Sequence, residues 1–432
     1  MSSQREPIAV IGTGYVGLVT AAGFAELGNE VWCVDVDAEK IAGLERGEMP
    51  IYEPGLTESI ARSAGRLHFS TELAPALEHA RLLFVAVGTP PTYSGDADLS
   101  SVHAVVDAMP SSDRHALVMK STVPVGTGGS IRRALDQRGK SGFSYVSCPE
   151  FLKEGSALED FLAPDRVVVG DVGDWAGDAV VDVYAPLNAP LVRTDIASAE
   201  MIKLAANAFL ATKISFINEI ANVCEETGAD VMEVARGMGL DQRIGTHFLR
   251  PGIGFGGSCF PKDVSALKQL AGNSGYHFQL LTAVIEVNEL QKRRVMAKLQ
   301  KHLGSLVGKT VALLGLAFKA NTDDMREASS LVLTARLQAD GARVRAFDPV
   351  AETEARKLMH GVEFADSALE AVRGADAIVL VTEWPEFGDL DWHEVADATA
   401  GRIVIDGRNF LDGEDVRAAG FVYEGVGRPT LG

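Results

Sequence analysis

The stretch that most constrains this fold is PIAVIGTGYVGLVTAAGFAELG, at residues 7–28. An apolar run typical of a strand leads into closely spaced glycines and then into a helix-forming run of small residues. A second apolar run, EVWCVDVD, follows at residues 30–37. Short buried strands that alternate with helices indicate a parallel sheet covered by helices. The chain is therefore predicted to begin with an α/β domain.

The same strand–helix pattern occurs in two parts of the chain. Its further strand-like runs are ARLLFVAVGTP, HALVMKSTVPVG and FSYVSCPEFLKEG, and then KTVALLGLAF, ARVRAFDP, DAIVLVTEW and RIVIDGRN. Between the two parts, a long helical stretch begins near residue 196 and contains no Pro or Gly before Gly228. The predicted fold class is α/β, with two Rossmann-like doubly wound parallel-sheet domains joined by a long central helix and an all-helical middle domain. The predicted domains are 1–195, 196–300 and 301–432.

Composition and charge exclude several classes of function. The net charge of −19 would repel a polyphosphate, so no nucleic-acid partner is expected. No apolar run approaches the roughly 20 residues that cross a bilayer, so no membrane partner is expected either. The first residues leave no room for a signal peptide, and the four scattered cysteines form no CxxC or Cys/His cluster. We therefore expect no metal site and no disulfide framework, and a cytoplasmic location.

The glycine turn predicts a dinucleotide site. Gly12, Gly14 and Gly17 have the GxGxxG spacing, and Val16 precedes the third glycine. The first glycine permits the tight bend, the second lets the backbone approach a pyrophosphate, and the third lets the helix pack on the strand. The second strand is expected to end at Asp35, where an acid accepts hydrogen bonds from the adenosine ribose and favours NAD over NADP. The alternative is a glycine turn beside an unrelated surface acid.

Three further residues are candidates for the same site. Lys40 lies about one turn beyond Asp35, and it either reaches the ribose or is a solvated helix lysine. Thr89 and Thr122 end strand-like runs, which is where ligands bind in this type of sheet. The alternative for both threonines is that they are ordinary loop residues.

One cysteine differs from the others in its surroundings. Three lie in apolar runs or in the long helical stretch and are interpreted as core residues: Cys33, Cys148 and Cys224. Cys259 lies instead in the glycine-rich loop GFGGSCFPKD, at residues 254–263. A nearby cation, Lys262, and the N-terminus of a helix beginning after Pro261 would both favour the thiolate. We therefore interpret Cys259 as a nucleophile for covalent chemistry.

Other polar residues suit a reaction at that thiol. Asp263 is a candidate base or water-positioning group. Lys203 and Asn207 are four residues apart in the long helical stretch and so share a helix face, where a cation and an amide can stabilise an alkoxide or a tetrahedral oxyanion. The alternative is an ordinary polar helix face.

The stretch CPEFLKEG, at residues 148–155, places two acids around a lysine at the end of a strand-like run. These residues are Glu150, Lys153 and Glu154. The acids are candidates for a general base or for substrate anchors, and the alternative is that they are acids at a helix start.

Taken together, the ordered motifs resemble those of the UDP-glucose/GDP-mannose dehydrogenase family along nearly the whole chain. They are GTGYVGL, VGTP, STVPVGT, PEFLKEG, EMIKLAANAFLATKISFINEIA, RIG, GFGGSCFPKD and GLAFKANTDDMREA. The resemblance implies two successive NAD-dependent oxidations of a sugar C6 hydroxyl to a carboxylate through a cysteine thioester. It implies a nucleotide sugar, UDP-glucose before others, as substrate. It also implies NAD binding by 1–195, homodimerisation through 196–300 and UDP-sugar binding by 301–432.

The resemblance also implies a role for individual residues. The implied catalytic residues are Cys259, Lys203, Asn207, Asp263, Thr122 and Glu150. The implied cofactor contacts, besides the three glycines and Val16, are Asp35, Lys40, Thr89, Thr122, Glu154, Lys262 and Arg326. The implied substrate contacts are Glu150, Phe151, Leu152, Lys153, Glu154, Lys203, Asn207, Arg243, Phe248, Leu249, Arg250, Pro251, Gly252, Phe255, Gly256, Lys319 and Arg408. Arg243 resembles the arginine that such enzymes extend across a dimer interface to the neighbouring substrate.

One departure from the family pattern concerns the sugar. The stretch FLRPGIGFGGSC has Arg-Pro-Gly where many UDP-glucose enzymes have an Ala-Gly type of segment, and its proline is similar to the GDP-mannose branch. RIG and CFPKD favour UDP-glucose. The alternative substrates are GDP-mannose and UDP-N-acetylmannosamine.

Two alternatives lie outside this reaction. A two-electron β-hydroxyacid dehydrogenase would leave Cys259 and the second α/β domain unexplained. A non-enzymatic sensor of NAD or of a sugar nucleotide would be favoured if Cys259→Ala left the measurable activity intact.

Overall fold

The computed structural model describes residues 5–93, 95–140 and 142–430, and the chain divides into two compact units. Unit 1 is Met1–Ala206 with Ser265–Tyr276, and unit 2 is Asn207–Val264 with His277–Gly432. The long helix α9, Ile196–Thr227, belongs partly to each unit. It ends before Gly228, whose φ of 77° is the left-handed conformation that glycine adopts readily at a helix end, as the sequence predicts.

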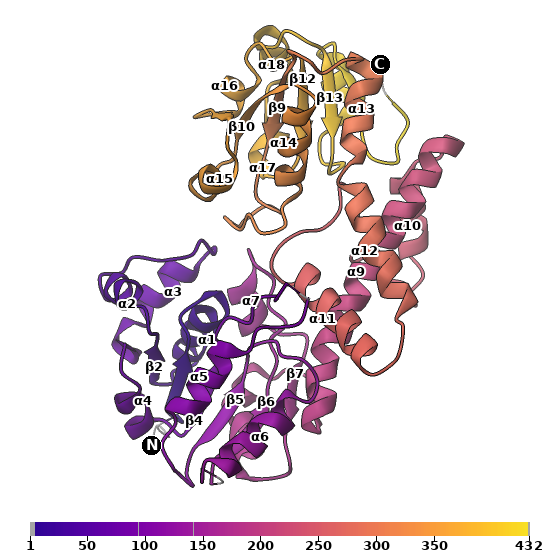
Figure 1. Ribbon diagram of the computed structural model, residues 1–432. Coiled ribbons are helices and arrows are strands. Elements are labelled where there is room, and N and C mark those ends of the chain that lie inside the picture. Colours follow the sequence, from indigo (N-terminus) through magenta and orange to yellow (C-terminus); the bar gives the residue numbers. More distant parts are fainter. Residues whose placement is uncertain (1–4, 94, 141, 431–432) are drawn as a thin grey trace. The chain divides into compact units, whose positions relative to one another are not determined.

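Unit 1 contains a sheet of eight strands among the residues described, in the order β3-β2-β1-β4-β5-β6-β7-β8 (Figure 1). The strands are β1 (Ile8–Ile11), β2 (Val31–Val34), β3 (Leu67–Ser70), β4 (Leu82–Val85), β5 (Ala116–Met119), β6 (Ser144–Ser147), β7 (Val167–Gly170) and β8 (Leu191–Thr194). Neighbouring strands run parallel except β6 and β7, which are antiparallel. The strand order reverses between β1 and β4, and ligands of open α/β sheets bind outside the carboxyl ends of the strands at such a point.

Helices cover both faces of this sheet. They are α1 (Tyr15–Glu26), α2 (Ala38–Glu45), α3 (Leu56–Arg62), α4 (Leu73–His79), α5 (Ser100–Ala108), α6 (Thr127–Gln137), α7 (Ala157–Leu162) and α8 (Trp175–Tyr184), with 3₁₀ turns η1 (Ala64–Arg66) and η2 (Ala185–Leu187). In β1, Ile8 and Val10 share a core with α1, α3, α7 and α8, whereas Ala9 and Ile11 share another core with α4, α5 and α6. Successive side chains of a strand point to opposite faces, so these two cores are the two faces of the sheet.

Unit 2 contains a parallel sheet of six strands in the part of the chain that is described, in the order β11-β10-β9-β12-β13-β14 (Figure 1). The strands are β9 (Thr310–Leu314), β10 (Arg343–Phe347), β11 (Val362–Phe364), β12 (Ala377–Leu380), β13 (Ile403–Asp406) and β14 (Val422–Glu424). The order again reverses next to the first strand, between β9 and β12. The carboxyl ends of these two strands are therefore the expected ligand edge of unit 2.

The helices of unit 2 cover both faces of its sheet. Beyond α9 they are α10 (Val231–Gly239), α12 (Gln279–Gln291), α13 (Arg294–Leu303), α14 (Ser329–Ala339), α15 (Glu352–Leu358), α16 (Ala368–Val372), α17 (Pro385–Gly388), α18 (Trp392–Ala398) and α19 (Gly413–Ala418), while α11 (Phe260–Asn273) begins in unit 2 and continues into unit 1. In β9, Val311 and Leu313 pack with α13 and α14, and Ala312 and Leu314 pack with α16 and α18. The two sheets confirm the predicted α/β class, whereas the predicted domain boundaries at 195 and 300 stay a prediction.

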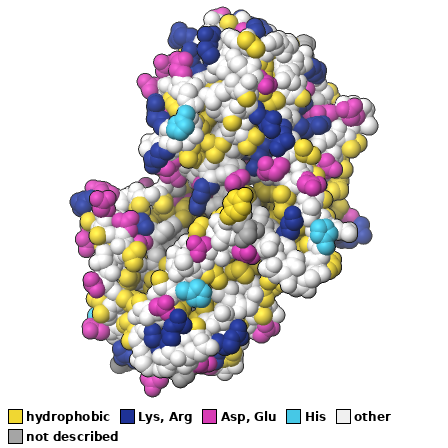
Figure 2. All heavy atoms as spheres, viewed as in Figure 1, with side chains coloured by type: hydrophobic (Ala, Val, Ile, Leu, Met, Phe, Trp, Pro, Cys, Tyr) yellow, Lys and Arg dark blue, Asp and Glu magenta, His cyan; other side chains and the backbone are white. Residues whose placement is uncertain are grey.

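The surface carries charges of both signs. On the face drawn in Figure 2, acidic and basic side chains are interspersed instead of gathered by sign. Over the residues that are described, no helix is both long enough and apolar enough to cross a membrane.

Candidate active site

The turn between β1 and α1 is too tight for side chains at two of its glycines. Gly12 has a φ of 98°, and a Cβ there would lie 2.6 Å from the carbonyl oxygen of Ala86. A Cβ on Gly17 would lie 1.8 Å from the carbonyl oxygen of Gly12, so only glycine lets α1 pack this closely. At Gly14, a Cβ would meet no described atom within 4 Å, and no described side chain caps α1. The N-terminal N–H groups of this helix are therefore open to an anion.

Asp35, which directly follows β2, is tied to this turn. Its Oδ2 accepts hydrogen bonds of 2.8 Å from both the N–H and the hydroxyl of Thr13, and Lys40 Nζ lies 3.1 Å away. Its Oδ1 accepts a 3.1 Å hydrogen bond from the Asp37 N–H. Burial opposes ionisation most strongly, but the hydrogen bonds from Thr13, Asp37 and Lys40 together lower the pKa of Asp35. Lys40 is thus paired with Asp35, and its contact with the ribose stays a prediction.

Thr89 and Thr122 follow β4 and β5 at the same edge of the sheet. The Thr89 hydroxyl donates a 2.9 Å hydrogen bond to the Thr122 carbonyl oxygen. Because β1, β4 and β5 are parallel neighbours, the segments after them lie side by side. The open helix end, the ionised Asp35 with spare acceptor capacity and this polar edge fit a dinucleotide such as NAD.

The segment after β6 carries a buried ion pair. Lys203 Nζ of α9 lies 2.9 Å from Glu150 Oε1, and the two side chains are 4% and 5% exposed. Glu150 Oε2 also accepts a 2.6 Å hydrogen bond from the Leu152 N–H. Burial alone would raise the pKa of Glu150, but the ammonium of Lys203, the Leu152 N–H and the charge of Lys120 hold it below its usual value. Glu150 is therefore an ionised carboxylate paired with a cation, an arrangement suited to proton transfer.

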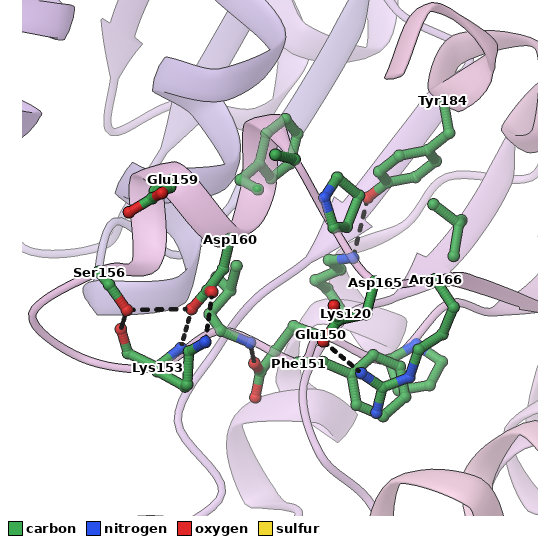
Figure 3. A pocket seen from close by; sticks show the side chains of 16 residues that line it. Lys120, Glu150, Phe151, Lys153, Ser156, Glu159, Asp160, Asp165, Arg166 and Tyr184 are labelled. Atoms are coloured by element: carbon green, nitrogen blue, oxygen red, sulfur yellow. Dashed lines mark hydrogen bonds and ion pairs between the residues drawn. The ribbon is translucent and has the colours of Figure 1, made fainter. Parts of the chain in front are cut away.

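A cavity of about 290 Å³ lies beside this ion pair within unit 1 (Figure 3). Glu150, Phe151, Leu152 and Lys153 line it together with Lys120, Ser156, Glu159, Asp160, Asp165, Arg166 and Tyr184. Lys120 Nζ donates a 2.8 Å hydrogen bond to the Tyr184 hydroxyl, and the Arg166 guanidinium lies 3.6 Å from the centre of the Phe151 ring. Lys153 Nζ pairs with Asp160 at 2.8 Å (Figure 3). Lys120, Arg166 and Tyr184 were not identified from the sequence, because no local pattern distinguishes them from other polar residues.

Glu53 links the glycine turn to the segment that follows Glu154. Its carboxylate is buried and accepts hydrogen bonds of 2.7 Å from the N–H groups of Gly155 and Ala157. It also accepts a hydrogen bond from the hydroxyl of Tyr15, the first residue of α1. Glu53 was not identified from the sequence. The sole local cue is its place in the stretch IYEPG, which reads as an ordinary turn.

Cys259 directly precedes α11 in unit 2. Its carbonyl oxygen accepts a 2.8 Å hydrogen bond from the Asp263 N–H, which places Cys259 at the helix N-terminus. The helix begins at Phe260, before the predicted start after Pro261, so Pro261 lies inside the first turn, where proline is tolerated. The thiol is partly exposed, and its Sγ lies 3.5 Å from the Ser258 hydroxyl. The structure thus places the thiol beside a helix N-terminus, and its predicted role as a nucleophile stays a prediction.

Asp263 lies in the first turn of the same helix and is buried. Its Oδ2 accepts a 2.6 Å hydrogen bond from the Asn207 amide, and its Oδ1 lies 2.9 Å from Lys262 Nζ. Three of the predicted catalytic and cofactor residues thus meet in one polar cluster of unit 2. Lys203 and Asn207 are one turn apart on α9, as their spacing predicts.

The remaining cysteines are buried, as expected for core residues. Cys33 and Cys148 are fully buried, and Cys224 is 4% exposed. Cys148 directly follows β6 instead of lying within the strand. Its Sγ accepts a long, 3.8 Å hydrogen bond from Lys120 Nζ.

The predicted substrate residues that precede Cys259 differ in their conformation and packing. Phe248 has a left-handed φ of 63°, and Leu249 is buried in the core of unit 2. The Arg250 guanidinium lies 5.9 Å from the centre of the Phe410 ring. Leu249 packs in the core of unit 2, and the half-buried Leu152 packs against the core of unit 1 and also lines the cavity.

The predicted cationic contacts of unit 2 lie mostly in loops after strands. Lys319 Nζ is 5.5 Å from the centre of the Phe318 ring. Arg326 pairs with Asp324 at 2.7 Å, and the largely exposed Arg243 pairs with Asp241. Arg408, after β13, donates hydrogen bonds of 2.8–3.1 Å to three backbone carbonyl oxygens, those of Val381, Gly254 and Phe318.

Comparisons with known proteins cover nearly the whole chain. Residues 6–188, 197–290 and 312–413 match, in this order, the NAD binding domain, the central domain and the UDP binding domain of the UDP-glucose/GDP-mannose dehydrogenase family. A UDP-glucose 6-dehydrogenase of Pseudomonas aeruginosa is 49% identical over 445 residues, which cover 98% of this chain and 98% of that protein.

Solved structures agree with these matches. A UDP-glucose dehydrogenase from the hyperthermophilic archaeon Pyrobaculum islandicum has a TM-score of 0.92 at 39% identity and covers 99% of both chains. A UDP-D-ManNAc dehydrogenase from Pyrococcus horikoshii has a TM-score of 0.85 at 29% identity, covering 98% of this chain and 99% of that one. From the matched domains and these relatives, we conclude that the chain belongs to the UDP-glucose/GDP-mannose dehydrogenase family.

Proposed function

We propose that this protein oxidises the C6 hydroxyl of UDP-glucose to a carboxylate, giving UDP-glucuronate, in two steps that use one active thiol. The family assignment makes the protein an oxidoreductase with NAD as its cofactor. In balance, one UDP-glucose, two NAD⁺ and one water give one UDP-glucuronate, two NADH and three protons.

The observation that carries this proposal is the setting of Cys259. The thiol lies at the N-terminus of α11, and Asp263, one turn further along, is paired with Lys262 and Asn207. Oxidation of an alcohol to an aldehyde needs no nucleophile. Oxidation of an aldehyde to an acid needs a nucleophile that adds to the carbonyl carbon, and a thiol can do so. The thiol therefore supports the four-electron reaction.

We propose that Gly12, Gly14 and Asp35 hold the cofactor, which when bound supplies the hydride acceptor for both oxidations. The pair of Glu150 and Lys203 accepts the hydroxyl proton in the first oxidation. Lys203 presents an ammonium beside an ionised carboxylate, so a proton can move within the pair without leaving a buried charge uncompensated.

The second oxidation uses the thiol. The Cys259 sulfur forms a bond to the aldehyde carbon, and the carbonyl oxygen becomes an alkoxide that the Asn207 amide and Lys203 stabilise. Loss of a hydride from this carbon leaves a thioester. Water then adds to the thioester carbon, the carbon–sulfur bond breaks, and the sulfur leaves as a thiolate. The carboxylate of Asp263 orients the water and takes up its proton.

UDP-glucose is proposed as the sugar because relatives carrying that name match more closely. Identity is 49% and 39% to the relatives named for UDP-glucose, and 29% to the UDP-D-ManNAc dehydrogenase. The alternative substrate is UDP-N-acetylmannosamine, because the Pyrococcus horikoshii relative is named for that sugar nucleotide.

The test is a steady-state comparison of UDP-glucose, UDP-N-acetylmannosamine and GDP-mannose, with the products identified by mass spectrometry. We expect UDP-glucose to have the highest kcat/KM and to yield UDP-glucuronate with two NADH per sugar. A higher kcat/KM for another sugar would contradict the substrate assignment. One NADH per sugar, with an aldehyde or ketone as product, would contradict the reaction.

We further propose that the functions divide as 1–195 for NAD, 196–300 for homodimerisation and 301–432 for the UDP-sugar. The three family matches, at 6–188, 197–290 and 312–413, support this division. The dimer is supported by Phe209, Phe216 and Val223 of α9, which are spaced by seven residues and are 66%, 47% and 56% exposed. Such a stripe on one helix face is an unfavourable surface for a monomer.

The dimer is tested by light scattering coupled to size-exclusion chromatography. We expect twice the chain mass for the parent protein and the mass of a monomer for Phe216→Asp. A parent protein of monomer mass at micromolar concentration would contradict this proposal. The expected cytoplasmic location stays a prediction.

A further inference from the structure

We infer that Asn288, together with Asn218 and Gln291, positions the cysteine nucleophile through the backbone of residues 252–257, which we name the cysteine loop. This inference rests on the proposed function of Cys259. None of the three amides was identified from the sequence.

The three amides bond the backbone of the cysteine loop as a neighbouring strand would. Asn218 of α9 accepts a 2.9 Å hydrogen bond from the Gly252 N–H, and Gln291 of α12 donates one of 2.9 Å to the Gly252 carbonyl oxygen. Asn288 of α12 accepts a 2.8 Å bond from the Phe255 N–H and donates a 3.1 Å bond to the Phe255 carbonyl oxygen. The amides are 0%, 1% and 3% exposed for Asn218, Gln291 and Asn288. Buried backbone groups need such partners, so the loop depends on these amides for its conformation.

The Asn288 side chain also leaves no room for a side chain at position 254 of the cysteine loop. Gly254 has a φ of 87°, and a Cβ at that position would lie 2.7 Å from Asn288 Oδ1. The loop is therefore fitted to the amide at residue 254 and bonded to it at residue 255. A movement of the loop away from Asn288 would break the two hydrogen bonds to Phe255, and a movement toward Asn288 would bring Gly254 into a steric clash with its side chain.

The fixed backbone is continuous with the nucleophile. The Phe255 ring packs edge-on against the Phe260 ring, with 5.8 Å between centroids, and Phe260 directly follows Cys259. Further along, the Gly257 N–H donates a 2.8 Å hydrogen bond to the carbonyl oxygen of Arg326. The loop is thus held at both ends, and Cys259 is presented at the start of α11. A reacting atom misplaced by about 1 Å can cost about 10²-fold in rate, so a loop of this kind has a direct influence on kcat.

A purely structural role is the competing explanation, because Asn288 and Asn218 also lie where α12 and α9 pack. Ser215 provides a matched control for this explanation. Its hydroxyl, in α9, donates a buried 2.9 Å hydrogen bond to the carbonyl oxygen of Val284 in α12, and neither residue belongs to the cysteine loop. Ser215→Ala therefore removes a buried contact between the same helices without touching the loop.

The experiment compares Asn288→Ala and Asn288→Asp with Ser215→Ala in the full chain. Asn288→Ala should lower kcat about 10²-fold and leave the KM for NAD within about twofold, because Gly12, Gly14 and Asp35, which we propose hold the cofactor, lie in unit 1. Asn288→Asp keeps the acceptor for the Phe255 N–H and loses the donor to its carbonyl oxygen, so an intermediate loss is expected. Ser215→Ala should keep the parent kcat.

A second measurement does not depend on turnover. The rate at which iodoacetamide alkylates Cys259, followed by mass spectrometry, should fall in both Asn288 variants and stay unchanged in Ser215→Ala. The inference is overturned if Asn288→Ala and Asn288→Asp alkylate and turn over at the parent rate, or if Ser215→Ala loses as much kcat as they do. Acid formation by Cys259→Ser would instead overturn the proposed function. An inactive Cys259→Ser beside unimpaired Asn288 variants would overturn this inference alone.

Discussion

Replacing Lys203 by methionine tests the electrostatics of the buried ion pair most sharply. Lys203 and Glu150 are 4% and 5% exposed and lie 2.9 Å apart, so the substitution leaves a buried carboxylate without its cation. Breaking a buried pair in this way costs roughly 3–5 kcal/mol. The Leu152 N–H still donates to Glu150 Oε2, so we expect Lys203→Met to destabilise unit 1 by about 3 kcal/mol at pH 7, near the lower end of this range.

The sign of the pH dependence follows from the lowered pKa of Glu150. In the parent protein, this carboxylate adds stability above its unfolded-state pKa, and that stability is lost as the pH falls through the lower folded-state value. In Lys203→Met the carboxylate loses its paired ammonium and keeps only the Leu152 N–H and the charge of Lys120 against the effect of burial, so its pKa is raised. The variant should therefore recover stability relative to the parent as the pH falls from 7 toward the raised pKa of the carboxylate, which is then protonated.

The assay is urea-dependent hydrogen exchange read by mass spectrometry. Peptides from β1 and β4 report on unit 1, and peptides from β9 and β12 report on unit 2 as an internal control. The double variant Glu150→Gln/Lys203→Met removes both charges, and it should be more stable than Lys203→Met alone by about 2 kcal/mol. A loss below about 1 kcal/mol at pH 7, or strictly additive effects in the double variant, would refute the reasoning.

Three further predictions concern other charged groups. Asp35→Ala should raise the Kd for NAD about 10–100-fold in calorimetry by removing a charged acceptor, and it should reduce the preference for NAD over NADP; an unchanged Kd would count against the ribose contact. Glu53→Gln should lower the stability of unit 1 by about 2 kcal/mol, because the amide cannot accept all the hydrogen bonds of the carboxylate; equal unfolding midpoints would contradict this role. The pKa of Glu424 is lowered against the effect of burial by His302, Lys298 and Lys301, so its contribution is lost as the pH falls below about 4.3. In Glu424→Gln, the free energy of unfolding of unit 2 should therefore fall less steeply below a pH of about 4.3 than in the parent protein. An equally steep fall in both proteins would contradict this prediction.

Local sequence patterns predicted the features of the fold that are determined by residues close together in the sequence. The glycine turn before α1 was predicted because strand, turn and helix are contiguous and each glycine has a steric reason. The length of α9 and the common face of Lys203 and Asn207 followed from helix periodicity. The short strands β3, β7, β8, β11 and β14 were not identified, because three or four residues at or near a sheet edge carry too weak a pattern.

Long-range pairs could not be predicted from the residues alone. Glu150 and Lys203 were each identified as candidates, but their mutual ion pair joins positions 53 apart in sequence. Glu53 bonds to groups 38, 102 and 104 residues away, so its stretch reads as an ordinary turn. The same holds for Asn288, whose partner Phe255 is 33 residues away. Each of these side chains is defined by the folded packing and not by its local sequence.

The central claim is that C6 of the sugar, after both oxidations, is carried as a thioester on the sulfur of Cys259. The most direct test is to quench the enzyme in acid during turnover with UDP-glucose and NAD, and to analyse the peptide containing Cys259 by mass spectrometry. The account predicts an adduct with the mass of the substrate less the four hydrogen atoms removed by the two oxidations, absent from Cys259→Ser. Unmodified Cys259 at every time point, with UDP-glucuronate still formed by Cys259→Ser, would contradict it.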